Sequence, residues 1–142
     1  MKKRHLLGLF AALSVLLVLL AACGSNTTSS GSQQVQVTLT GTAMTSSMTT
    51  FTPGMAYHFV VTNNGQDAQV FSMVPMGMDM EHMSMNAIRS NALHMIDNIA
   101  PSMTATFDYT LASSMMQRNF EFSCIASGHS TGWMSLPFII SQ

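Results

Sequence analysis

Apolar and polar residues alternate along most of the chain after residue 34, which is the pattern of strands with one buried face. In the first such stretch, Val35, Val37 and Leu39 alternate with polar neighbours. The expected strands span residues 35–40, 56–62, 69–74, 103–111, 119–125 and 134–141, with a weaker one over 48–52. Turn signals such as Pro-Gly and Asn-Asn-Gly separate them. Six to eight short strands of this kind predict an all-β Greek-key sandwich.

Residues 75–101 interrupt the alternation and are too many for a plain hairpin loop. Long loops of this kind are usually functional or disordered. Six methionines lie here or just before, among Gly, Asp, Glu, His and Ser residues: Met73, Met76, Met78, Met80, Met83 and Met85. Only residues 85–95 show a trace of helical periodicity. The sequence therefore predicts one long Met-rich loop.

The N-terminus has the pattern of a secretory signal. Lys2, Lys3 and Arg4 precede an apolar run that ends in Leu-Ala-Ala-Cys23, which resembles the lipobox of bacterial lipoproteins. We therefore expect a signal peptide over 1–22, a lipid on Cys23 and a flexible tether over 23–34, followed by one domain over 35–142. Such a domain would work outside the cytoplasm, held at the membrane surface by its lipid. An uncleaved membrane anchor is the alternative.

Charge and cysteine content narrow the function. After loss of the signal, only Arg89 and Arg118 remain against six acidic residues, so no basic patch is available for nucleic acid. With Cys23 lipidated, Cys124 has no disulfide partner within the chain. A lone thiol in an oxidising compartment is exposed to oxidation unless it is buried, paired between chains or bound to a metal.

Three potential metal ligands lie close together near the C-terminus. Cys124, His129 and Met134 follow one another at Cys-x4-His-x4-Met spacing, directly after an expected strand. Thiolate, imidazole and thioether together favour copper. A buried structural cysteine is the simpler interpretation of Cys124 alone, but it does not account for the other two residues.

This motif, together with Val60-Val-Thr-Asn-Asn-Gly65 before a strand, resembles the cupredoxins, the small blue-copper proteins. The resemblance covers about residues 35–142 and implies a β-sandwich with one copper ion. It also implies an upstream histidine ligand, but Gln69 stands at that position. Gln69 can bind through its amide oxygen or line the site, or His82 or His94 can replace it, or the site can be degenerate. An amide is a harder and weaker ligand than an imidazole, so we expect the remaining soft donors to favour Cu(I).

Electron transfer through one copper ion is the function that the resemblance implies. The alternative is Cu(I) sequestration or delivery, with a second site formed by Met76, Met78, Met80, His82, Met83 and Met85. Methionine also packs well in irregular cores, and this interpretation competes equally with metal binding. Either function needs a redox or copper-exchange protein partner. An enzyme is not expected, because multicopper oxidases and nitrite reductases need further histidine-built sites.

Overall fold

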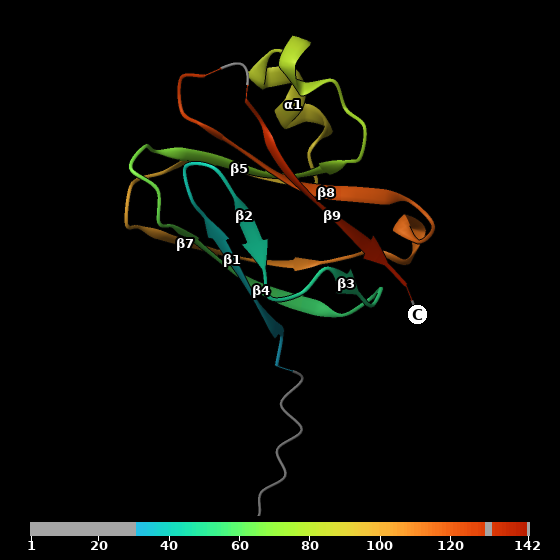
Figure 1. Ribbon diagram of the computed structural model, residues 1–142. Helices are drawn as coiled ribbons and strands as arrows, with labels where there is room; N and C mark the ends of the chain where they lie inside the picture. Colours follow the sequence, from blue (N-terminus) through green and yellow to red (C-terminus); the bar gives the residue numbers. More distant parts are fainter. Residues whose placement is uncertain (1–30, 130–131, 142) are drawn as a thin grey trace, which may run out of the picture. The chain divides into compact units, whose positions relative to one another are not determined.

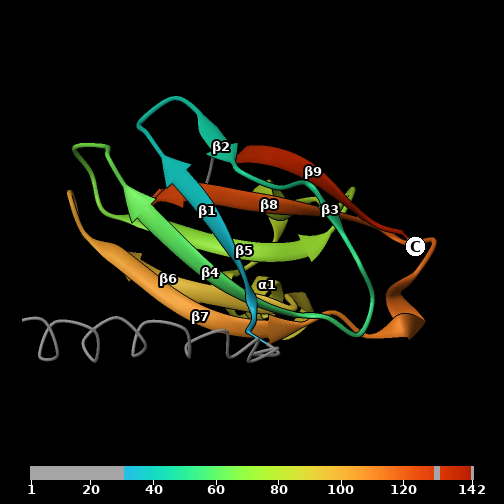
Figure 2. The ribbon, with the colours of Figure 1, turned by 90° about the horizontal axis from the view of Figure 1, so that it is seen from below.

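Two β-sheets lie face to face in the part of the chain that the computed structural model describes, residues 31–129 and 132–141 (Figures 1 and 2). The predicted signal peptide and Cys23 lie outside these residues. The four-stranded sheet has the order β2-β1-β4-β7 and the five-stranded sheet the order β3-β9-β8-β5-β6. The strands are β1 Gln33–Leu39, β2 Met44–Ser46, β3 Thr50–Phe51, β4 Ala56–Asn63, β5 Gln69–Pro75, β6 His94–Ile99, β7 Thr104–Thr110, β8 Asn119–Ala126 and β9 Met134–Ile140.

Neighbouring strands within each sheet are mostly not consecutive in the sequence. β4 lies beside β7, and β5 lies beside β8, so the connections cross between the sheets as in a Greek key. β1 pairs with β4, and β3 with β9, in parallel; the other pairs are antiparallel. The predicted all-β sandwich is confirmed.

The segment expected as a long loop contains regular structure. It holds the short helix η1 (Met80–His82), the helix α1 (Met85–Asn91) and the edge strand β6. The trace of helical periodicity after residue 85 corresponds to α1, whose first turn is capped by the Ser84 hydroxyl accepting from the Ala87 amide at 3.2 Å. Among the described strands, β6 pairs with β5 alone, and its residues lack strict alternation, which explains why the sequence did not indicate it. The sequence did not indicate strand β2, because three residues are too few to show an alternating pattern.

Aromatic side chains form the centre of the core between the sheets. Phe122 is fully buried, and its ring lies 4.6 Å from that of Phe138 and 5.9 Å from that of Phe71, measured between centroids. Phe51 and Phe59 contact the same ring edge-on. These residues come from both sheets, so the alternation of their strands directs them into one interior.

A second apolar cluster involves Val74 of β5, whose chain neighbour Met73 belongs to the main core. Successive side chains of a strand point to opposite faces, so Val74 marks the outer face of the five-stranded sheet. We call this group the outer-face cluster; it comprises Val74, Met80 and Ile88, with Met78, Met83, Met85, Ala92, Met95 and Trp133 packed against them. Helix α1 lies over this outer face (Figure 1). None of the helices in the described residues is long and apolar enough to cross a membrane.

Candidate metal centre

Three of the four candidate ligands lie on strands that are neighbours in the five-stranded sheet. Cys124 pairs with Met134 across β8 and β9, and with Phe71 across β8 and β5. Gln69 lies two residues before Phe71 on β5, opposite Ala126. Residues in direct register, or two apart on one strand, point to the same face of a sheet. Gln69, Cys124 and Met134 therefore share the inner face at one end of the sandwich.

The fourth candidate, His129, follows β8 in a tight turn. Its amide donates to the Ala126 carbonyl at 3.1 Å, and Gly128 has a φ of +85°, as the third residue of a type II turn requires. The Ser127 amide donates to the Ala68 carbonyl at 2.7 Å, which ties this turn to the residue before Gln69. The turn and the start of β5 thus lie at the same end of the sandwich (Figure 1).

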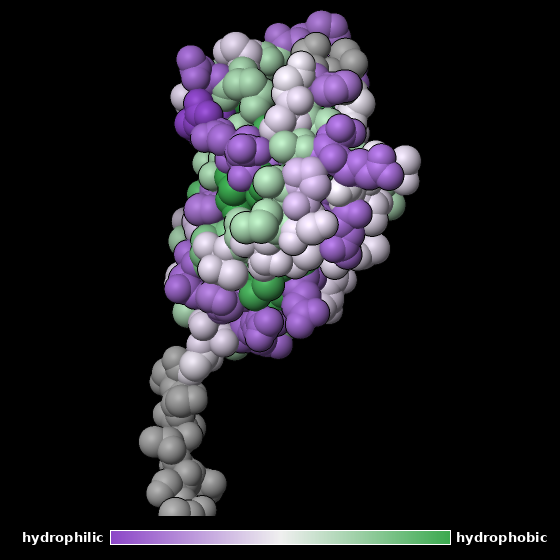
Figure 3. Space-filling model, turned by 90° about the vertical axis from the view of Figure 1, so that its left-hand side faces the viewer, coloured by the Kyte–Doolittle hydropathy of each residue, from purple (hydrophilic) through white to green (hydrophobic). Residues whose placement is uncertain are grey.

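A pocket of about 250 Å³ opens at this end. It is lined by Gly41, Asp67, Gln69, Ile125, Ala126, His129, Gly132 and Met134. Cys124 is not part of the lining but lies fully buried beside Met134. Figure 3 views this end of the molecule, where apolar patches lie among polar residues. The fold thus brings together the four side chains that the sequence singled out.

The thiol of Cys124 is neutral in the metal-free protein. Its exposed fraction is 0%, and burial raises the pKa of Cys124 to about 12. A metal ion bound by this sulfur would therefore displace its proton.

Gln69 carries a buried acceptor without a partner. The residue is 1% exposed, and its Oε1 accepts no hydrogen bond within the described residues. Asn63 fixes the loop before it: its Nδ2 donates to the carbonyls of Asp67 and Ile99, each at 2.8 Å, and its Oδ1 accepts from the Gly65 amide at 2.8 Å. Buried acceptors are rarely left unpaired, so an amide oxygen on a residue that lines the pocket suits a bound cation.

The donor set fits copper. No three His, Cys, Asp or Glu side chains gather into a metal site in residues 31–129 and 132–141. A centre at this pocket would therefore depend on the Met134 thioether and the Gln69 amide oxygen beside Cys124 and His129. Sulfur-rich sets of this kind select copper over Mg, Ca or Mn.

The other histidines lie elsewhere. His94 is in register with Met73, four residues along β5 from Gln69, or roughly 13 Å at the usual rise per residue. Its ring stacks on Phe107 with 3.8 Å between centroids, and burial lowers the pKa of His94. His82 is exposed; its Nδ1 lies 2.8 Å from Asp79, whose hydrogen bond raises the pKa of His82. Neither residue lines the pocket.

His58 lies on the surface face of its strand, opposite Phe59. Phe59 is fully buried, whereas the His58 side chain is 38% exposed and pairs with Asp108 at 2.8 Å. His58 therefore belongs to the outer face of the four-stranded sheet.

The methionines of the expected second copper site are mostly packed. Met80 is buried in the outer-face cluster, and Met78, Met83 and Met85 pack against it. Met76 is 49% exposed. Packing accounts for four of these five thioethers, and a second Cu(I) site stays a prediction.

Comparison with solved structures decides the fold. Auracyanin from the photosynthetic bacterium Roseiflexus castenholzii aligns with a TM-score of 0.58 at 17% identity, over 79% of this chain and 99% of that one. Auracyanin A, a blue copper protein from the green thermophilic photosynthetic bacterium Chloroflexus aurantiacus, aligns with a TM-score of 0.55 at 13% identity, over 78% of this chain and 100% of that one. Auracyanin B gives 0.57 at 13% identity, over 78% and 89% of the two chains. The chain has the cupredoxin fold.

The likeness to these cupredoxins is one of fold. No protein-family model matches the sequence, and no curated protein matches it. Within this cupredoxin fold, the pocket lies where β5 and β9 begin and β8 ends. The choice of ligands in it is argued from the residues of this chain.

Sequence reasoning missed residues that line or support this pocket, among them Asp67 and Asn63. Asp67 lines the pocket two residues before Gln69, and the Asn63 side chain braces the loop between them. The Asn-Asn-Gly run signalled a turn, but the side-chain bonds of Asn63 reach Ile99, 36 residues away. Such a long-range contact leaves no local signal in the sequence.

Proposed function

We propose that the protein binds one copper ion through Cys124, His129, Met134 and Gln69 and carries single electrons. The observation that supports this is the convergence of Gln69, His129 and Met134 on one pocket beside the buried thiol of Cys124. Copper bound there would supply the one-electron couple. Four protein ligands leave no open position for a substrate, which favours a carrier over an enzyme.

The residues of the pocket would limit the movement of the ligands and give an electron a route to the metal. Gln69, Cys124 and Met134 lie on paired strands, so the ladder limits how far these ligands move when the charge of the metal changes. His129 is exposed, whereas Cys124 is fully buried. The His129 imidazole is therefore the ligand through which an electron from a protein partner would enter.

A second function is favoured by one residue. Gln69 offers an amide oxygen where an imidazole would stabilise Cu(II), so the sulfur donors of Cys124 and Met134 dominate the site. This composition favours Cu(I) and suits sequestration or delivery. Electron transfer remains our conclusion because the methionines that would extend such storage mostly pack in the outer-face cluster.

We further propose that the domain is anchored to the extracytoplasmic face of a membrane. The support is the apolar N-terminal run that ends in Leu-Ala-Ala-Cys23, followed by eleven residues, 24–34, without charge or apolar side chains. A lipid on Cys23 would hold the chain at the surface, and the tether would let the pocket reach a redox partner.

Copper titration of the full chain in detergent tests the function. One copper per chain with a reversible one-electron couple and a thiolate-to-copper absorption band supports electron transfer. Colourless Cu(I) binding that is lost on oxidation favours copper handling. Absence of binding in both oxidation states contradicts both functions.

Single variants then test the ligand set. Cys124→Ser and His129→Ala should each weaken copper binding at least tenfold, because each removes one donor. His58→Ala is the matched control: it removes an imidazole that pairs with Asp108 on the other sheet. Equal losses in His129→Ala and His58→Ala would contradict the proposed ligand set.

A further inference from the structure

Trp133 and Met134 are consecutive residues that serve opposite faces of the five-stranded sheet. Met134 lines the pocket and packs against the main core. Trp133 packs instead against the outer-face cluster. Contacts that hold Trp133 on the outer face therefore also fix where β9 begins and how Met134 is placed in the pocket.

Most other members of the cluster that Trp133 joins come from residues 76–92, between β5 and β6, which we call the cap. Met80 and Ile88 of the cap are buried, and with Val74 of β5 they form the centre of the cluster that Trp133 joins. The indole Nε1 of Trp133 is buried and has no hydrogen-bond partner within the described residues. The indole is thus held by apolar contacts, for which thioethers are well suited because sulfur contacts aromatic rings favourably.

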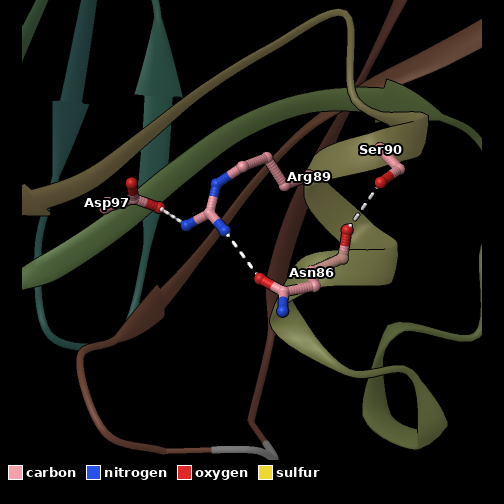
Figure 4. Close-up of polar contacts among 4 residues, drawn as sticks. All are labelled: Asn86, Arg89, Ser90 and Asp97. Carbon is pink, nitrogen blue, oxygen red and sulfur yellow. Dashed lines mark hydrogen bonds and ion pairs between the residues drawn. The ribbon is translucent and has the colours of Figure 1, made fainter.

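The cap is in turn attached to the sheet. The guanidinium of Arg89 on α1 pairs with Asp97 of β6 and donates to Asn86 Oδ1 at 3.0 Å, while the Ser90 hydroxyl donates to the Asn86 carbonyl at 2.9 Å (Figure 4). α1 also contacts β5 directly. The cap therefore links two strands of the sheet to the residue that precedes Met134.

We propose that the cap positions Met134 through Trp133. By holding the indole on the outer face, the cap fixes the start of β9 and with it the register of Met134 with Cys124. Trp133 is a positioning residue, and the methionines of the cap serve as packing partners of its ring. The consequence for copper affinity rests on the proposed function; the effect on β9 does not.

Amide hydrogen exchange on the full, metal-free chain tests the positioning. In Trp133→Ala and in Met80→Ala, exchange at residues 134–136 should become at least tenfold faster, while amides of β1 and β4 keep their rates. Trp133→Phe should restore most of the protection, because a ring again fills the cluster. Met103→Ala, which removes an exposed methionine far from the cap in sequence, should change nothing.

Val35→Ala serves as the comparison for general destabilisation, since Val35 is buried in the four-stranded sheet. It should raise exchange rates broadly rather than at the start of β9. Uniform acceleration in Trp133→Ala, like that in Val35→Ala, would overturn the positioning role. Unchanged rates at residues 134–136 would overturn it as well.

Copper binding provides the second readout. Competition with a Cu(I) chelator should show at least tenfold weaker binding in Trp133→Ala and near wild-type binding in Trp133→Phe. Wild-type affinity in Trp133→Ala, despite faster exchange at β9, would overturn the link to the pocket. If the wild-type chain binds no copper, the proposed function fails, and the exchange experiment alone decides the positioning of Met134.

Discussion

The buried thiol of Cys124 makes the stability of the metal-free protein depend on pH in the alkaline range. Burial raises the pKa of Cys124 from 9.0 to about 12 in the folded chain. The folded state therefore retains a proton that the unfolded state releases. A group with a raised pKa contributes stability that is fully present below its unfolded pKa and is lost as pH rises toward its folded pKa. The affected window is thus about pH 9 to 12.

The size of this effect follows from the two pKa values. A tenfold difference in proton affinity corresponds to about 1.4 kcal/mol, so the full loss between pH 9.0 and about 12 is about 4 kcal/mol. By pH 10.5 the loss should already be about 2 kcal/mol. Burial also raises the pKa of Tyr109, so this phenol likewise makes the folded protein less stable as the pH rises in the alkaline range. The contribution of the thiol must therefore be isolated by a variant.

Cys124→Ala provides that comparison. Urea unfolding of both proteins, metal-free and with reductant, gives the free energy of unfolding from pH 7.5 to 10.5. We expect the difference between wild type and variant to be constant up to about pH 9 and then to fall by about 1.4 kcal/mol per pH unit. The small void left by alanine shifts the curve by a constant amount. If the free energies of unfolding of wild type and Cys124→Ala ran parallel from pH 7.5 to 10.5, the raised pKa of the buried thiol would be refuted.

Three further substitutions test the pocket and the core. Gln69→Leu should raise the free energy of unfolding of the metal-free protein by about 1 kcal/mol, because it removes Oε1, which has no partner within the described residues. The same substitution should weaken copper binding. A free energy of unfolding below that of the wild type, measured in urea, would contradict this expectation. Phe122→Ala should cost about 3–5 kcal/mol in the same assay, and a cost under about 1 kcal/mol would show that the ring is not central to the core. Asn63→Ala should cost about 2–3 kcal/mol by freeing two carbonyls and one amide, whereas Asn64→Ala, at an exposed position, should be nearly neutral.

Sequence reasoning succeeded where one face of a strand is buried. β4 and β7 alternate strictly in exposure, and both were expected to within two residues. β6 is the last strand of its sheet and has three partly buried residues in succession, so its sequence carries no two-residue period. The helix α1 was only hinted at, because its seven residues bury a single side chain, that of Ile88.

The residues of the pocket also differ in whether local sequence or long-range strand pairing brings them together. Cys124, His129 and Met134 could be grouped from sequence because one turn and one strand pair bring them together. Gln69 could be placed beside them only through the resemblance to cupredoxins, since its position depends on the register of β5 with β8. The contacts of Trp133 with the cap could not be anticipated, because they join segments about 50 residues apart that share no local motif.

One group at this end of the sandwich is unfavourable in the metal-free protein. The Gln69 acceptor is buried and has no partner within the described residues. Leucine at this position would avoid that cost, so stability alone does not explain the amide. Departures from good packing chemistry of this kind are expected at functional sites. The neutral thiol of Cys124 is buried at the same end of the sandwich and packs without such a cost. A cation bound as we propose would be coordinated by the Gln69 amide oxygen and would displace the proton of the Cys124 thiol, and this is our main physical reason for proposing copper at these two residues.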